Sequence, residues 1–488
     1  MKKIINYLIL FCSISFFVLW MIFKDFNILI WSVFLFNIQN VLFCLRNIKR
    51  RIYLLFFNIT IFLFLLSRPV IEMIWNYEWI NYNERNGSFA LLAIGCSLLF
   101  LFIGTIFGEK IPYKNKYEQS SKVSQSIIVN NLKLVSLIMY YITIIATFII
   151  GLEKITFIKD SNYADYYITY KSNLPGIVNI IDTMMPAIFA LYLSTMPKKK
   201  QAIFPITLYI LSMIPDLIVG ARGPISEALI FVFLYFFMRD SENAKTDKDK
   251  NIKTEVWVTK WIKRLIVLGL PIIFIVFSSY NYIRFGIEKT NDMNPVVDFV
   301  YSQGVSFTTI TRGYDSIPYL PDYDEKNYTF GPFIDYIKAG TPSQILFGVE
   351  GIPESNSIER AVRGNNFSDA LSYYLYKSSY LQGRGTGSSF IIEVYADFGI
   401  IGIVIFSILL GILFSSIGNK FNISWFTNLI LLRILMDIFI IPRNPAMSWL
   451  KFLIAPQFWV PILACWILAK IISNREKKFM NIKYQKVK

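Results

Sequence analysis

The stretch ADFGIIGIVIFSILLGILFSSI, residues 396–417, indicates the fold class of this chain. It is apolar except for Asp397 near its start, and its length is close to the roughly 20 residues with which a helix crosses a bilayer. Across the chain, 55% of the 488 residues are hydrophobic, which is more apolar surface than a water-soluble domain of this size can cover. We therefore expect an all-α polytopic membrane protein. Comparable runs occur at roughly 4–23, 26–45, 52–68, 88–108, 134–151, 176–195, 202–220, 225–238, 265–280, 396–417, 421–440 and 452–472.

Basic residues indicate how these twelve predicted spans are oriented. The net charge is +16, and Lys and Arg concentrate at 46–51, 198–200, 239–264 and after 475. The positive-inside rule places these segments, and with them both termini, in the cytoplasm. The excess charge thus sets orientation, and we expect membrane lipid, not nucleic acid, as the surroundings of the chain.

Loop lengths divide the chain into three parts. Residues 1–280 would form nine helices with short loops, and 396–488 the last three helices and a basic cytoplasmic tail. Between them, 281–395 is too long for a connector and contains apolar stretches at 330–337 and 345–349. Loops of this size are usually functional or disordered. We expect it to fold as a large extracytoplasmic cap.

Charged residues inside or beside the predicted spans fall almost entirely on the outward-facing side. A charge in hydrocarbon costs several kcal/mol unless it is paired or hydrated, so such residues usually mark a functional site. A polar site open to the outside suggests chemistry on an exported, membrane-anchored substrate. The residues are Arg68, Asp182, Asp216, Arg222, Glu227, Arg284, Arg384, Glu393, Asp397, Arg433, Asp437 and Arg443.

The richest motif is GRGTGSSF, residues 383–390, which runs into IIEVYADFG, residues 391–399. A Gly-rich turn before an apolar run is typical of a helix start, with Ser388 or Ser389 as N-cap. Free N–H groups there attract phosphates, so we assign both serines to substrate binding, and Arg384 adds a cation. Glu393 and Asp397 share one helix face. The structural alternative is a capped helix with two interfacial carboxylates.

A second motif, DLIVGARGP at residues 216–224, holds Arg222 at the outer mouth between two predicted spans. Arg284 and Arg443 follow two other predicted spans. Several arginines at separate helix ends suit a diphosphate, which needs several cations around it. The alternative for Arg222 is an interface anchor paired with Asp216 or Glu227. Arg433 and Asp437 are spaced as a structural pair within one helix.

Other residue types exclude several kinds of chemistry. The chain contains no histidine, which removes His-based acid–base catalysis and nearly every zinc site. Its four cysteines lie in apolar stretches. Asp322-Tyr323-Asp324 resembles a metal-holding carboxylate motif, but such triplets arise by chance and this one lies in an acidic loop tip. We predict no metal and no cofactor.

The many spans, the late outer loop, Gly220-Ala221-Arg222-Gly223 and the stretch from Gly383 to Gly399 together resemble the Wzy-type oligosaccharide repeat-unit polymerases of bacterial surface polysaccharide assembly. The resemblance implies a metal-independent glycosyltransferase with a GT-C-like fold in the cytoplasmic (inner) membrane. Its substrates would be oligosaccharides linked to undecaprenyl diphosphate. Because Arg222 and Arg384 lie in the matching motifs, the resemblance implies that they bind the diphosphate. Arg284 and Arg443 are added to this group on their position alone. The repeat of an Arg, ten residues and a Gly found in some members is not evident.

The implied reaction transfers the growing chain onto the next lipid-linked unit at the outer face, yielding a product such as O-antigen or capsule. The acceptor hydroxyl benefits from a carboxylate base, for which Glu393 is the first candidate and Asp397 the second. A chain-length regulator and a flippase are possible partners.

One alternative is a lipid-linked polysaccharide ligase, although ligases are understood to use an outer-loop His. A flippase or other transporter needs polar groups through to the inner side, which this chain lacks. A non-enzymatic assembly partner would not need the Arg and Glu set.

Overall fold

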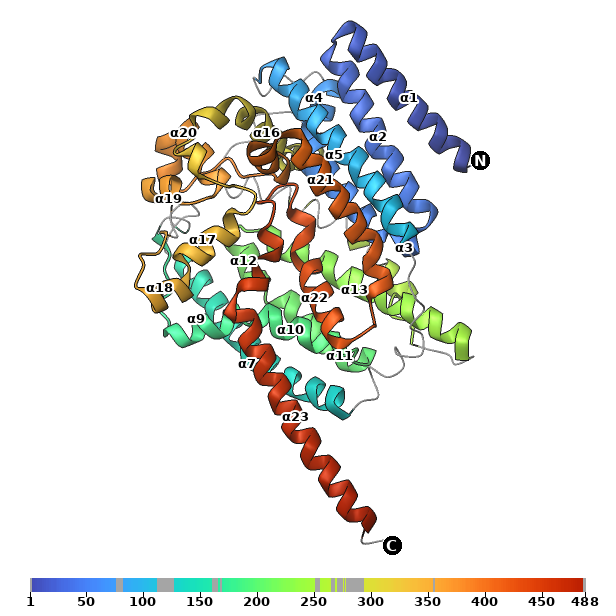
Figure 1. Ribbon diagram of the computed structural model, residues 1–488, viewed down its shortest axis with the longest axis vertical. Coiled ribbons are helices and arrows are strands. Elements are labelled where there is room, and N and C mark those ends of the chain that lie inside the picture. Colours follow the sequence, from blue (N-terminus) through green and yellow to red (C-terminus); the bar gives the residue numbers. More distant parts are fainter. Residues whose placement is uncertain are drawn as a thin grey trace.

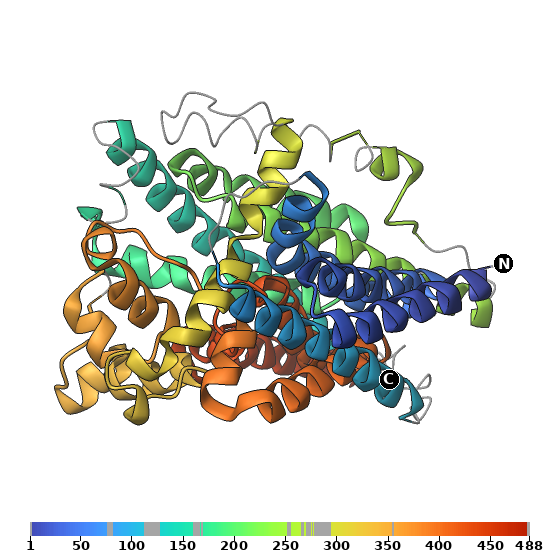
Figure 2. The same cartoon turned by 90° about the horizontal axis from the view of Figure 1, so that it is seen from above.

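The computed structural model describes residues 2–75, 82–111, 127–159, 166, 169–250, 255–264, 268–269, 275, 277, 294–353 and 356–485. Within these ranges the regular structure is helical and includes no β-strand. Two groups of long helices lie beside each other, and a set of shorter helices covers one end of them (Figure 1; Figure 2). We call this end the cap end.

The first group contains the N-terminal helices and one late helix. Its tightest packing joins α5 to α21, and α2 packs on both α3 and α5. The apolar side chains of α1 are mostly exposed beyond its contact with α2, as suits a helix covered by lipid. The members are α1 (Lys2–Phe23), α2 (Phe26–Arg46), α3 (Ile48–Ile61), the π-helix η1 (Phe62–Leu66), α4 (Ser67–Trp75), α5 (Glu84–Lys110) and α21 (Phe390–Lys420).

The second group is built around α7, which packs on α10 and α23. Its last helix, α23, extends beyond the rest of the molecule (Figure 1) and carries Arg475, Lys477 and Lys478 in its outer part. The members are α7 (Ile127–Lys159), α9 (Gly176–Thr183), α10 (Met185–Ser194), α11 (Lys199–Leu211), α12 (Ile214–Val219), α13 (Gly223–Lys250), α22 (Trp425–Asp437) and α23 (Pro456–Gln485).

The described part of the predicted cap is helical. Helix α16 is its most buried element and packs on α5 and α21, whereas α17 and α18 lie further out. Two apolar stretches predicted within it, 330–337 and 345–349, coincide largely with α17 and α18. The elements are α15 (Pro295–Gln303), α16 (Val305–Ser316), the 3₁₀ helices η2 (Ile317–Tyr319) and η3 (Tyr323–Glu325), α17 (Gly331–Ala339), α18 (Thr341–Phe347), α19 (Ile358–Arg363) and α20 (Phe367–Leu381).

Small residues explain the close approach of α5 and α21. Gly104 and Gly108 are four apart on α5, and Gly411 and Ser415 are four apart on α21. A Cβ on Gly104 would overlap the carbonyl oxygen of Ile408, and one on Gly411 would overlap the carbonyl oxygen of Leu101. This small-xxx-small pattern lets the two backbones come into contact. In a bilayer the hydrophobic effect does not drive helices together, so such close van der Waals packing supplies much of the association energy.

Nine helical stretches of the described chain are long and apolar enough to cross a membrane, and each matches a predicted span. The all-helical, multi-pass architecture is therefore confirmed, while the number twelve stays a prediction. The predicted span 225–238 lies within α13. The predicted span 421–440 becomes the 13-residue α22 followed by the 3₁₀ helix η4 (Ile438–Ile440). The predicted span 265–280 lies mostly outside the described residues.

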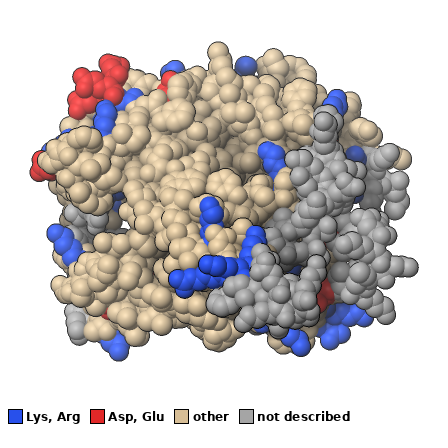
Figure 3. Space-filling view, turned by 60° about the horizontal axis from the view of Figure 1, so that its bottom comes forward, with Lys and Arg blue, Asp and Glu red and all other residues tan. Residues whose placement is uncertain are grey.

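Basic side chains are prominent on one face of the molecule. When the bottom of Figure 1 is brought forward, most of the charged side chains that are seen belong to Lys and Arg (Figure 3). This agrees with the net charge of +16 for the whole chain. The orientation itself stays a prediction.

Candidate functional site

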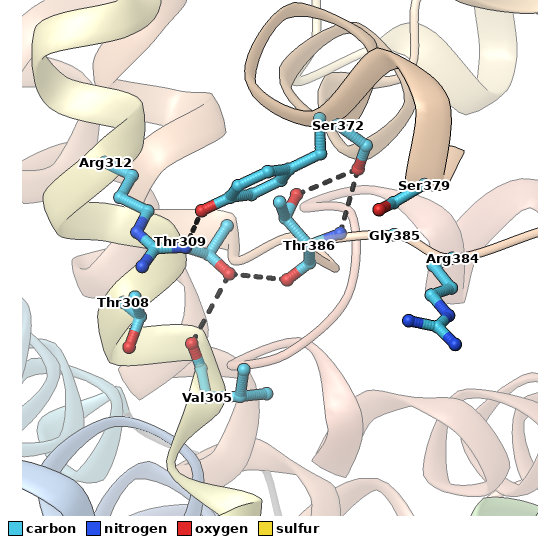
Figure 4. A pocket seen from close by; sticks show the side chains of 10 residues that line it. Val305, Thr308, Thr309, Arg312, Ser372, Ser379, Arg384, Gly385 and Thr386 are labelled. Atoms are coloured by element: carbon cyan, nitrogen blue, oxygen red, sulfur yellow. Dashed lines mark hydrogen bonds between the residues drawn. The ribbon is translucent and has the colours of Figure 1, made fainter. Parts of the chain in front are cut away.

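A cavity of about 180 Å³, lined by two arginines and several hydroxyl-bearing residues, lies at the cap end between α16, α20 and the loop before α21. Figure 4 shows Arg312 on one side of it and Arg384 on the other, with Thr309 and Thr386 between them. Hydroxyl groups supply most of its other polar atoms. The lining residues are Val305, Thr308, Thr309, Arg312, Ser372, Tyr376, Ser379, Arg384, Gly385 and Thr386.

Hydrogen bonds fix the loop that carries Arg384. The hydroxyl of Thr309 donates to the carbonyl of Thr386 over 2.7 Å, and the N–H of Thr386 donates to Ser372 over 2.8 Å. Gly387 has φ of +74°, a left-handed conformation that suits glycine. Arg384 itself is exposed, and among the described residues its guanidinium makes no hydrogen bond or ion pair. The loop therefore presents a cation that a ligand can reach.

A second group of arginines lies behind this cavity. Arg68 donates to the hydroxyl of Thr308, which lines the cavity, over 3.2 Å and to the carbonyl of Tyr301 over 3.0 Å. Arg443 donates to Gln303 over 2.9 Å, and Arg222 donates to the carbonyl of Phe277 over 2.6 Å. Arginine remains cationic even when partly buried. This end of the molecule therefore holds several fixed positive charges.

These arginines lie close enough together for their charges to interact. Burial lowers the pKa of Arg443, and the positive charges of Arg222 and Arg68 lower it further. Arg68 also interacts with Arg312 of the cavity. Like charges gathered in a partly buried place favour the binding of an anion, because an anion relieves their repulsion.

Glu393 is fully buried, although the sequence indicated a residue at a helix mouth. Its carboxylate accepts from the hydroxyl of Ser388 over 2.6 Å and from the N–H of Ala446 over 2.7 Å. The N–H of Phe390 also donates to Ile441. Glu393 thus joins the loop of Arg384 to the turn of Arg443, and it does not line the cavity described above. Its role as base stays a prediction.

Asp397 and the two serines also have structural contacts. Asp397 accepts from the N–H groups of Tyr328 and Thr329, at 3.1 and 2.5 Å, and so ties the cap to α21. Ser389 is the N-cap of α21 and accepts from the N–H of Ile391. Ser388 bonds to Glu393, and both serines are buried. Their direct contact with substrate stays a prediction.

The structure thus brings together Arg222 and Arg443 in one group and places Arg384 in the adjoining cavity. Arg284 lies outside the described residues. Two arginines near the site were not predicted to belong to it. The sequence indicated only that Arg68 lies at the end of a predicted span, and it assigned no role to Arg312. A signal for Arg312 existed in TTITRG, residues 308–313, where one cation follows a hydroxyl-rich stretch in the cap.

Carboxylates do not gather in the described chain as a metal site would require. No group of three or more His, Cys, Asp or Glu side chains is placed to hold an ion among the described residues. Asp322 and Asp324 are exposed at the outer surface of the cap. The polar groups that do converge are arginines and hydroxyls, which bind anions.

These features define the class of the protein: it is a multi-pass helical membrane protein with a helical cap and a cavity that carries arginines. The family model described as O-antigen polysaccharide polymerase Wzy matches residues 4–476, nearly the whole chain, and the chain belongs to this family. It is accordingly an O-antigen repeat-unit polymerase of polysaccharide biosynthesis, a multi-pass inner-membrane protein that acts on lipid-linked oligosaccharide repeat units. No curated protein and no solved structure shows significant similarity to it.

Proposed function

We propose that this polymerase transfers a growing glycan from undecaprenyl diphosphate onto the next lipid-linked repeat unit at the outer face of the membrane. The observation that carries the proposal is the convergence at the cap end of arginines that are far apart in sequence. Arg312 and Arg384 line the cavity, while Arg68 and Arg443 lie behind it in the helix bundle, where Arg68 contacts the lining residue Thr308. A diphosphate carries enough negative charge to engage several of them at once.

The chemistry follows from charge neutralisation. The bond between the anomeric carbon and the diphosphate oxygen breaks, a bond from the acceptor hydroxyl to that carbon forms, and the hydroxyl proton passes to a base. Arginines held in place before the reaction stabilise the departing diphosphate without reorganisation, which is usually the largest contribution to catalysis. The same role is played by a metal ion elsewhere. We therefore propose a metal-independent glycosyltransferase of the GT-C type.

Glu393 remains our first candidate for the base and Asp397 the second, but their contacts favour positioning. Both oxygens of Glu393 are occupied by the hydrogen bonds to Ser388 and Ala446. Those bonds hold two arginine-bearing segments against each other. In this role Glu393 would set the spacing between Arg384 and Arg443, and a different group would take the proton.

The wider arrangement belongs to the same proposal. Twelve spans would put both termini in the cytoplasm and the cap, residues 281–395, on the extracytoplasmic side. Residues 1–280 and 396–488 would form the membrane-embedded parts. A flippase that delivers lipid-linked units and a regulator of chain length would be its partners.

Deletion of the gene tests the proposal against its main alternative, a lipid-linked polysaccharide ligase. We expect cells without the protein to accumulate lipid-linked material of a single repeat unit, because each transfer needs this enzyme. Gel sizing of the surface glycan together with mass analysis of extracted lipid-linked intermediates measures the outcome. Full-length polymer retained on the lipid carrier would instead show a ligase, and an absence of lipid-linked units at the outer face would show a transporter.

A further inference from the structure

A larger cavity, of about 430 Å³, lies beside the first turns of α20, next to the smaller cavity that Arg312 and Arg384 line. It is formed by α17, α18, α19, the start of α20 and the segment 445–451. We propose that this cavity binds sugar residues of the lipid-linked chain, an inference that rests on the proposed function. Its volume falls within the roughly 300–1,000 Å³ of cavities that hold small ligands.

The lining has the chemistry that a sugar needs. Carboxylates of Asp335 and Asp369, the amide of Asn366 and the cations of Arg360 and Lys451 surround the space. Sugar hydroxyls both donate and accept hydrogen bonds, so a mixed set of this kind can satisfy them where a purely cationic or apolar surface cannot. Tyr336 adds a ring that can pack against the C–H face of a pyranose.

The groups are held in place before any ligand arrives. Arg360 donates to Asp369 over 2.8 Å, and Asp335 accepts from the backbone and side-chain nitrogens of Asn365. The ammonium of Lys451 lies 5.3 Å from the centre of the Tyr336 ring, whose hydroxyl donates to Gln457 over 3.0 Å. A preorganised set of this kind loses little side-chain entropy when it binds.

Two chain segments connect this cavity to the arginine site. On α20, Asp369 lines the larger cavity, and Ser372, one turn later, lines the smaller one. In the 441–451 segment, Pro445 lines the larger cavity two residues after Arg443. A substrate whose diphosphate binds the arginines could therefore extend its sugars into the cap.

The test uses the full-length protein in lipid nanodiscs. The probe is the oligosaccharide released by mild acid from the lipid-linked material of cells that lack the gene. We expect Lys451→Gln and Tyr336→Ala each to weaken binding of this free oligosaccharide about tenfold, as loss of one good contact does. In polymerisation, they should raise KM for the lipid-linked unit with kcat nearly unchanged, because the lost contact is shared by ground state and transition state.

A matched variant controls for folding and for charge. Lys338→Gln changes an exposed lysine of α17 that does not line the cavity. We expect it to bind the oligosaccharide like the wild type. Unchanged affinity and KM in Lys451→Gln and Tyr336→Ala, with thermal stability retained, would overturn the inference.

The failure of the inference can be told apart from failure of the proposed function. If the wild type polymerises and Arg384→Ala is inactive while both cavity variants behave normally, the glycan lies elsewhere and the polymerase assignment stands. If the wild type forms no polymer from lipid-linked units, the proposed function fails first. Equal loss of binding in Lys451→Gln and Lys338→Gln would assign the effect to charge and overturn the cavity as the binding site.

Discussion

Arg384 is the residue whose environment is most easily tested. It is exposed in the smaller cavity, and its loop is fixed by Thr309 and Ser372. Removal of one preorganised group that stabilises a developing charge typically lowers kcat by about 10²-fold or more. We expect this loss for Arg384→Ala, with smaller loss for Arg384→Lys, since lysine keeps the charge without the planar fork. Polymer formation from purified lipid-linked units measures it.

Arg363 provides a matched control for the Arg384 experiment. It also lies in the cap, but it is paired with Glu359 and Glu350 and lines neither cavity. Surface pairs of this kind contribute little to stability. We expect Arg363→Ala to polymerise like the wild type. Equal activity of Arg384→Ala and Arg363→Ala would remove Arg384 from the diphosphate site.

Glu393→Gln separates the two roles considered for this carboxylate. Glutamine keeps the shape and one acceptor but cannot take a proton. Glutamine can accept only one of the two hydrogen bonds, so we expect lower thermal stability in either role, because a buried donor left unpaired costs roughly 1–3 kcal/mol. If Glu393 only positions the two segments, polymerisation should fall by about tenfold; if it is the base, polymerisation should be abolished at the same melting temperature. Activity and melting curves of one preparation decide between them.

At the level of residues, the sequence predicted those cations whose local context is distinctive. Arg384 is flanked by two glycines and Arg222 lies in the sequence Gly-Ala-Arg-Gly, and such a local context can be recognised from the sequence alone. Arg312 lies within a helix, and its relation to Arg384 depends on how α16 packs against the loop before α21. The burial of Glu393 likewise depends on Ala446, which is 53 residues away in sequence. Such contacts follow from tertiary packing and not from a local pattern.

At the level of elements, the pair α5 and α21 positions the site. The start of α21 carries Glu393 and Asp397, while α5 contacts α16 through the stacking of Phe89 on Tyr314, with ring centres 3.7 Å apart. Gly399, at φ of +61°, interrupts α21 just after Asp397. The bend separates the first turns, which bind the cap, from the remainder, which packs on α5. Movement between α5 and α21 would therefore move the cap relative to the arginines below it.

Gly411→Val tests the close approach of these helices. The added side chain would overlap the backbone of Leu101 and Thr105, so α5 and α21 must separate. Overpacking typically costs about 1–3 kcal/mol, and we expect a lower melting temperature and reduced polymerisation. Gly176→Val is the control, because a Cβ at Gly176 meets no atom within 4 Å. Similar melting temperatures for the two variants would contradict the proposed packing.

Spans were easier to predict than helix ends. The apolar runs fix where a helix crosses lipid, because length and hydropathy decide it. The start of α21 at Phe390, six residues before its apolar span, was also predicted, because a Gly-rich turn with Ser388 or Ser389 as N-cap marks a helix start, and Ser389 is the observed cap. Helix α16 was not predicted, because it is buried by contact with α5 and α21 and its hydroxyl-rich sequence lacks an apolar run. The GxxxG pattern of α5, residues 104–108, is a local signal for the close packing of this helix.

At the scale of the whole molecule, the proposed function differs from that of metal-dependent glycosyltransferases in its source of positive charge. Arg312 and Arg384 line the smaller cavity, the bundle arginines lie behind it, and the exposed Asp322 and Asp324 lie away from its lining. We expect polymerisation by the purified protein to continue in EDTA at a rate within about twofold of the untreated enzyme, because guanidinium groups neutralise the leaving diphosphate. High salt should inhibit instead, since screening weakens these contacts. The opposite result would be loss of activity in EDTA, recovery when magnesium or manganese is added, and no such recovery in the double variant Asp322→Asn with Asp324→Asn. That result would assign the neutralising role to a bound ion instead of the arginines.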